Sequence, residues 1–146
     1  MVNESRIDLY DYLYNLFYDV VTKNVYAMRE PSELTPSDSS EGFIVIRVGS
    51  ITDASEFAGE AYARVRCYVQ AFIPPISRGR LDYDKYAVFE NAIVDVIKNA
   101  TEDEDSSYYI ESDDILSSDA EETENANNTF YTFIKSFIVV IDNQQE

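Results

Sequence analysis

Carboxylates are the side chains with which this chain could do chemistry. It contains 28 Asp and Glu residues against 11 Lys and Arg, no His, no Trp and a single Cys. Without His, neither Ser-His-Asp nor Cys-His catalysis is possible, and conventional zinc sites are excluded as well. The four glycines, at positions 42, 49, 59 and 79, form no motif that cradles phosphate. What remains are clusters of acids and a few arginines.

The densest acid cluster combines residues 102–105 with Glu111, Asp113 and Asp114. Ca²⁺ takes several oxygen ligands, so a calcium site is one interpretation. The glycine of an EF-hand loop is missing, however, and such runs arise readily in an acidic chain, which favours a solvated acidic loop. We therefore predict no metal and no cofactor. The predicted acidic surface consists of Glu102, Asp103, Glu104, Asp105, Asp113 and Asp114.

A carboxylate pair for glycoside hydrolysis is a second interpretation of the acids. That chemistry needs two carboxyl groups in a cleft, with pKa values that differ. A chain of 146 residues with no Trp to stack on a sugar offers little support for it. With the nucleophilic triads also excluded, we predict that the protein is not an enzyme.

Arginine and tyrosine gather in one short stretch of the chain. The outward positions of a predicted strand read Tyr62, Arg64, Arg66 and Tyr68, and the basic turn 77–80 follows. Tyr and Arg are enriched in the parts of interfaces that contribute most binding energy. A basic aromatic sheet face can also bind single-stranded nucleic acid. The candidate interface residues are Tyr62, Arg64, Arg66, Tyr68, Arg78 and Arg80.

The overall charge helps to decide whether the Tyr/Arg strand binds a protein or a nucleic acid. A net charge of -17 repels polyanions, so we predict no specific nucleic acid and no anionic membrane as partner. Contact with an acidic protein surface, such as the acidic segment of an identical neighbour, uses the same arginines at a lower electrostatic cost than binding a polyanion. A third reading, in which they only solubilise one sheet face, stays open.

The elements that position these residues begin with a helix. Its predicted range is Ser5–Lys23, with Ser5 as the N-cap and Asp8 completing a capping box. Its apolar stripe consists of Ile7, Tyr10, Leu13, Tyr14, Phe17, Val20 and Val21. The stretch 30–42, rich in Pro, Ser and acids, reads as a connector.

Two strands then form a predicted hairpin. In Phe43–Ile51 the residues alternate between two faces, and from Ala61 to Ile73 every odd position is small or apolar. The small side chains indicate that a helix packs closely on that face. Cys67 lies on it and reads as a buried small hydrophobe. Pro74-Pro75 must end the strand, because proline cannot donate to the ladder.

The rest of the chain predicts a helix, a loop and a last strand. Asp82 caps the helix, whose stripe is Tyr86, Phe89, Ile93, Val96, Ile97 and Ala100. Residues 101–128 read as a mobile acidic loop that includes at most a short strand in YYIESDDILSS. Phe130–Ile141 is apolar on both faces, which predicts a place in the middle of the sheet or against a neighbouring subunit. A polar tail, 142–146, follows.

The whole therefore reads as a single α+β domain, 1–146, with a mainly antiparallel β-sheet packed with two helices in the order α-β-β-α-β. The start MVNESRIDLY lacks the pattern of a signal peptide. Apolar runs such as Phe137–Ile141 are shorter than the roughly 20 residues of a membrane helix. With one Cys, assembly in the cytosol is expected.

This order of elements resembles the tail-terminator and tail-completion proteins of bacteriophages. The resemblance lies in a first helix like IDLYDYLYNLFYDVV, a hairpin like GFIVIRV and YARVRCYVQAFIPP, a helix like YDKYAVFENAIVDVIKNA and a last strand like TFYTFIKSFIVVID. It implies a structural virion protein that forms a closed homo-oligomeric ring in the phage neck or tail, joins portal or connector to tail proteins, and lines the DNA passage. Assembly would take place in the host cytoplasm. The long acidic segment after the second helix departs from that pattern.

A second hypothesis assigns the function to the acids themselves. An acidic inhibitor that mimics DNA would bind a DNA-binding protein, and it would be a monomer or dimer rather than a ring. The mass of the protein in solution separates the two hypotheses.

Overall fold

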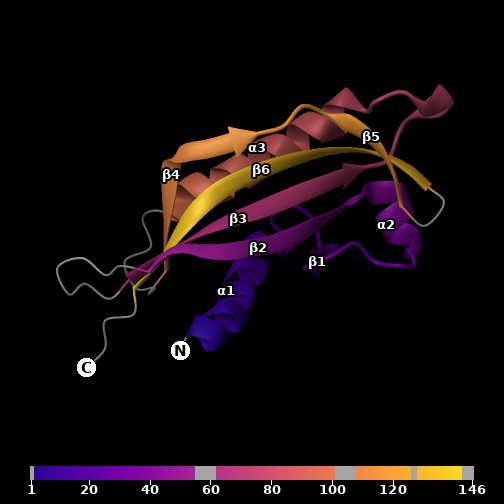
Figure 1. Cartoon of the computed structure of the whole chain (residues 1–146). Helices are drawn as coiled ribbons and strands as arrows, with labels where there is room; N and C mark the ends of the chain where they lie inside the picture. Colours follow the sequence, from indigo (N-terminus) through magenta and orange to yellow (C-terminus); the bar gives the residue numbers. More distant parts are fainter. Residues whose placement is uncertain (1, 55–61, 101–107, 126–127, 143–146) are drawn as a thin grey trace.

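The computed structural model describes residues 2–54, 62–100, 108–125 and 128–142, and side chains over 9–49, 64–100, 108–111, 115–125 and 128–140. It is a mixed α+β fold (Figure 1). The helices are α1 (Val2–Phe17), α2 (Pro36–Glu41), the short 3₁₀ turn η1 (Ser77–Gly79) and α3 (Tyr83–Ala100). The strands are β1 (Val25–Ala27), β2 (Phe43–Ala54), β3 (Tyr62–Ile73), β4 (Tyr108–Ser117), β5 (Glu121–Asn125) and β6 (Asn128–Asp142).

All six strands belong to one sheet, in the order β1-β2-β3-β6-β4. Only β1 pairs in parallel, and β2, β3, β4, β5 and β6 pair antiparallel. Strands β4 and β5 pair with successive parts of the same side of β6, so together they form one edge of the sheet. The predicted β2–β3 hairpin is confirmed, and β6 lies in the interior of the sheet as its two apolar faces required.

One face of the sheet is covered by α1 and α3 and holds the main core. The odd positions of β3 that the structure describes, from Val65 to Ile73, are all buried there, which confirms the predicted alternation. The predicted stripe of α3 packs on them, and α1 contributes Leu9, Leu13 and Phe17. This face is therefore a conventional apolar helix–sheet interface.

Among the described residues, the opposite face of the sheet is covered only at one end. There Phe43, Val45, Phe72 and Phe130 form a second, smaller cluster. The rings of Phe43 and Phe72 stack with centroids 4.4 Å apart. Leu34, from the segment that leads into α2, packs on this cluster. We call the cluster and its cover the α2 end of the second face; it is at the right of Figure 1.

The first helix ends earlier than predicted. It stops at Phe17 rather than Lys23, because Asp19 adopts a positive φ of 62° and the chain turns. A bridge between Tyr18 and Thr22 closes this turn. Val20, predicted to lie on the buried stripe, is consequently 58% exposed.

The predicted connector 30–42 contains a helix. Thr35 caps α2 in a complete capping box with Asp38, and Pro36 occupies the first turn, where its missing N–H costs nothing. The helix ends at Gly42, which has a φ of 94°; a Cβ there would lie 2.5 Å from the carbonyl oxygen of Phe72. Only glycine permits this close approach of α2 to β3.

The prediction of an acidic loop over 101–128 is wrong for much of that range. Residues 108–117 form β4 and residues 121–125 form β5, whereas 101–107 lie outside the described residues. The sequence EETEN forms a strand because an edge strand needs backbone partners more than apolar side chains, and β6 supplies them. The predicted five-element order α-β-β-α-β likewise omitted β1, α2 and this second pair of strands.

Candidate interaction surface

The part of the second face that α2 leaves uncovered carries the predicted Tyr/Arg strand. Residues that pair directly across strands share a face, so the register defines its rows. Arg64 pairs with Val140, which pairs with Tyr109; Tyr68 pairs with Ser136, which pairs with Leu116. We call this area the open strip. It consists of Arg64, Arg66, Tyr68, Tyr109, Glu111, Leu116, Ile134, Ser136, Ile138 and Val140.

The arginines of the open strip bond to neighbouring strands of the same chain. A guanidinium nitrogen of Arg64 lies 2.8 Å from the Glu111 carboxylate, and Arg66 donates to the hydroxyl of Ser136 at 3.0 Å. Arg47, next to the strip, binds Gln70 at 2.6 Å and Glu30 at 2.9 Å. These charged side chains therefore link different parts of the sheet by hydrogen bonds. The bonds support a structural role in addition to any role in binding.

Apolar side chains give the open strip its exposed contact area. Leu116 is 54% exposed and Tyr109 is 52% exposed. Leu116 lines a shallow hollow of about 220 Å³ together with Tyr68, Ile134 and Ser136. Exposed apolar groups on a rigid sheet, with Tyr and Arg beside them, have the composition of a protein contact site.

The structure does not bring the four predicted arginines together. Arg66 is seven residues from the end of β3 at Ile73, about 23 Å at roughly 3.3 Å per residue, and Arg78 and Arg80 lie beyond that end in an exposed turn. Arg78 has a positive φ of 64°, and the turn is held by Tyr131, which donates to the carbonyl of Gly79 at 2.7 Å. The four predicted arginines therefore form two separate groups, one on β3 and one in the turn after it.

The predicted acidic surface lies mostly outside what the structure describes. Residues 102–105 fall in an undescribed range, and so do the side chains of Tyr62, Asp113 and Asp114, although all three lie on strands. Between Glu111 and Leu116 the register of β4 shifts against β6, so Asp113 and Asp114 lie in an irregular part of the edge. Within the described residues, no group of three His, Cys, Asp or Glu side chains could hold a metal ion.

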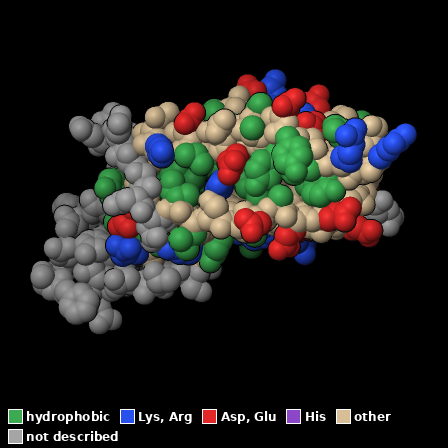
Figure 2. Space-filling view, turned by 90° about the horizontal axis from the view of Figure 1, so that it is seen from above, with side chains coloured by type: hydrophobic (Ala, Val, Ile, Leu, Met, Phe, Trp, Pro, Cys, Tyr) green, Lys and Arg blue, Asp and Glu red, His purple; other side chains and the backbone are tan. Residues whose placement is uncertain are grey.

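Figure 2 looks onto the side of the molecule that is uppermost in Figure 1, where β4, β5 and α3 lie. Hydrophobic side chains gather in the middle of this face with acidic side chains around them. Exposed acids of β5, Glu121, Glu122 and Glu124, belong to this edge. Such charges discourage pairing of the edge with a strand of an identical, acidic neighbour, so the faces of the molecule are better candidates for contact than this edge.

Two groups, the buried Cys67 and the partly buried Tyr26, have strongly raised pKa values. Burial raises the pKa of the Cys67 thiol to about 12, against a partial opposing effect of Arg66. Cys67 is therefore a protonated core residue at neutral pH, as predicted, and not a nucleophile. Burial, followed by the 2.6 Å hydrogen bond to Asp38, raises the pKa of Tyr26 to about 12.

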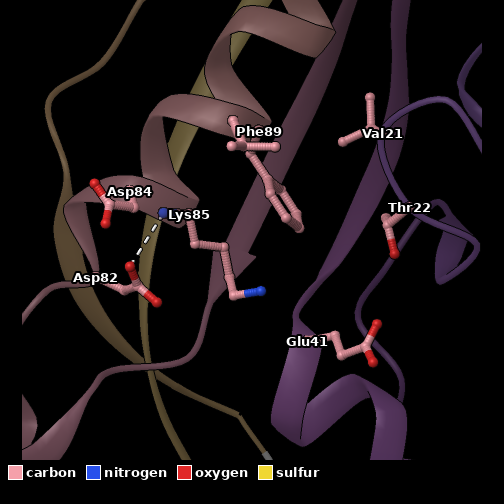
Figure 3. Close-up of a pocket in the computed structure, with 8 residues that line it drawn as sticks. Val21, Thr22, Glu41, Asp82, Asp84, Lys85 and Phe89 are labelled. Carbon is pink, nitrogen blue, oxygen red and sulfur yellow. Dashed lines mark hydrogen bonds between the residues drawn. The ribbon is translucent and has the colours of Figure 1, made fainter.

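A second hollow, of about 450 Å³, lies on the helical side of the molecule (Figure 3). Val21 and Thr22 of the turn after α1 form one wall and the start of α3 forms the other, with Phe89 between them and Glu41 below. Asp82, which caps α3 through the N–H of Lys85 at 3.1 Å, and Asp84 complete it. Sequence reasoning identified Asp82 only as a cap; the approach of α2 to this hollow had no local signal.

The open strip was also incompletely predicted. Its β3 half followed from alternation in the sequence, but Tyr109, Leu116 and Ile134 come from strands whose register only the fold defines. The strand that the sequence suggested in YYIESDDILSS is β4, where Ile110 alternates with exposed Tyr109, but its pairing with β6 had no local signal.

No protein-family model matches this sequence, and a search of curated proteins finds no match. Among the helices that the structure describes, none is both long and apolar enough to cross a membrane.

Proposed function

We propose that this protein is a structural subunit that acts by binding, and that it assembles with copies of itself into a ring in the neck or tail of a bacteriophage. The observation that carries the proposal is the open strip: a sheet face that the described residues cover at one end only, with Leu116 and Tyr109 exposed on its β4 side. A monomer has no evident use for such a face.

The order of the major elements supports the phage setting. A long helix, an antiparallel hairpin, a second long helix and a long interior strand occur as α1, β2–β3, α3 and β6. This is the order on which the resemblance to tail-terminator and tail-completion proteins rests. The chain has a net charge of -17. In the proposed ring, part of its acidic surface faces the passage, where negative potential lets DNA move without adhering.

Contact through the open strip is proposed to rest on its exposed apolar residues on β4, with the arginines on the β3 side. Arg64 and Arg66 already bond within the chain, so their gain from a partner is small. Leu116 and Tyr109 lose water on assembly at little entropic cost, because the strand already fixes them.

Sedimentation velocity of the full chain, over a wide range of concentration, tests the proposal. We expect a closed oligomer of defined mass, and we expect Leu116→Glu to reduce it to monomer without altering the circular dichroism spectrum. Val88→Glu, at a site on α3 that is 62% exposed, is the matched control and should leave the mass unchanged.

A wild-type chain that stays monomeric at every concentration would overturn the ring. A monomer that also binds a basic nuclease would favour the DNA-mimic hypothesis instead. An oligomer that survives Leu116→Glu would remove the open strip from the interface.

A further inference from the structure

A pair of hollows lies along α3 on the helical side of the molecule, opposite the open strip. The wide end is the hollow of about 450 Å³ at the start of α3. The other end is a hollow of about 290 Å³ between Leu16 and Val20 on one side and Val96 and Asn99 on the other. We call the two together the α1–α3 groove.

Both hollows are lined by α3 on one side and by neighbouring residues of the chain on the other. On α3 they include Lys85, Val88 and Phe89 at one end and Val96, Asn99 and Ala100 at the other, residues spaced by three, four or seven. The opposite wall is formed by consecutive residues, Val20 in one hollow and Val21 and Thr22 in the other. From Lys85 to Asn99 the groove extends about 21 Å at 1.5 Å per residue.

The floor of the groove is apolar and accessible. Val88 is 62% exposed and Val20 is 58% exposed, and neither is needed to fill the core. Val88 in one hollow and Val20 in the other, with Phe89 and Leu16 respectively beside them, can accept the apolar side of a helix. The early end of α1 produces this wall, because the turn at Asp19 directs Val20 outward.

The charge of the groove specifies its occupant. Three carboxylates, Glu41, Asp82 and Asp84, line the wide end, against the single ammonium group of Lys85. Within the described residues none of the three forms an ion pair; the ion pairs there are Arg47–Glu30, Arg64–Glu111 and Lys135–Glu90. A partner that carries positive charge beside its apolar residues therefore meets surplus negative charge here, and an acidic partner is repelled.

We propose that the α1–α3 groove binds a cationic amphipathic helix of a partner protein, about four turns long, with its apolar side on Val20 and Val88 and its basic residues at the wide end. The occupant is a different protein rather than a second copy, because this chain is strongly acidic. The inference is independent of ring formation, since it uses the opposite side of the sheet.

Fluorescence anisotropy with three labelled 18-residue peptides tests this at physiological salt. One is an amphipathic Leu/Lys helix, the second has the same composition in an order that destroys the apolar side, and the third is an amphipathic Leu/Glu helix. We expect the first to bind at least about tenfold more tightly than the second, and the third not to bind. Equal binding of the first two would overturn the proposal, because it would show attraction by net charge alone.

Variants locate the site. Val88→Glu and the pair Glu41→Lys with Asp84→Lys should each weaken the Leu/Lys peptide about tenfold or more. The matched pair Glu121→Lys with Glu122→Lys makes the same change of charge on exposed positions of β5 and should have a small effect. Equal losses from both pairs would overturn the groove as the site.

One further variant separates this inference from the proposed function. Leu116→Glu should abolish self-assembly and leave peptide binding intact, whereas Val88→Glu should do the reverse. Loss of both properties in either variant would contradict two independent surfaces.

Discussion

The two faces of the sheet differ in what covers them. The face beneath α1 and α3 is a continuous apolar core, whereas the second face has one aromatic cluster at the α2 end and an open strip beyond it. On the first face, side chains were selected to exclude water. On the second, Arg64 and Glu111 hold strands together in partial contact with water, and Leu116 is left exposed. The comparison indicates which face maintains the fold and which face is available to a partner.

The largest effect should come from the covered face. Phe137 is fully buried there and its ring lies 6.5 Å from that of Phe17 of α1. We expect Phe137→Ala to lower the free energy of unfolding by about 3–5 kcal/mol, since it removes buried surface and leaves a cavity. Urea denaturation measures it.

The control for this prediction is Leu116→Ala on the open strip, which should change stability by no more than about 0.5 kcal/mol. Phe72→Ala measures the contribution of the second face, because Phe72 is fully buried in the smaller cluster. A loss as large as that of Phe137→Ala would show that the α2 end is a second core of equal weight. Equal effects of Phe137→Ala and Leu116→Ala would contradict the distinction between the faces.

Raising the pH should destabilise the covered face more than the α2 end, with a smaller loss of stability than Phe137→Ala causes. The folded pKa of Cys67 is raised from 9.0 to about 12, so the stabilisation from its buried neutral thiol is complete below pH 9 and is lost as the pH rises from about 9 to 12. At pH 11 this loss amounts to roughly 3 kcal/mol. The pKa of Tyr26, at the α2 end, is raised from 10.0 to about 12, so its contribution disappears between about pH 10 and 12.

Urea denaturation of the wild type, Cys67→Ala and Tyr26→Phe at pH 8 and pH 11 checks this. The difference in stability between the two pH values should shrink markedly in Cys67→Ala and less in Tyr26→Phe, because Tyr26 is less buried. An unchanged difference in Cys67→Ala would mean that the thiol becomes hydrated before the protein unfolds.

The smallest effect should come from the ion pair of the open strip. Arg64→Glu places two carboxylates opposite each other and should cost about 1 kcal/mol, since both side chains are partly exposed. The double variant Arg64→Glu with Glu111→Arg restores opposite charges and should recover most of that loss in denaturation experiments. If the single and double variants are equally stable, the pair contributes nothing to the sheet and the arginines only solubilise it.

Much of the fold could be predicted because local patterns and tertiary packing agree. The alternation from Val65 to Ile73, the stripe of α3 and the cap at Asp82 each follow from a simple period or a single side chain. The apolar spacing of the first helix continues to Val20, beyond the end of α1 at Phe17. The prediction failed there because the backbone turns at Asp19. Strand β5 was missed for the opposite reason, since its stability comes from the partner strand and not from its own residues.

By itself, the sequence determined the class of the fold, the covered face of β3 and the absence of His-dependent chemistry, because composition and period are properties of the chain alone. Only the tertiary structure decided which side chains meet. It separated Arg66 from Arg78, joined Arg64 to Glu111, and brought Glu41 and Asp84 into the lining of one hollow. The physical reason is that register and helix approach are set by contacts between residues far apart in the chain, and no local pattern contains that information.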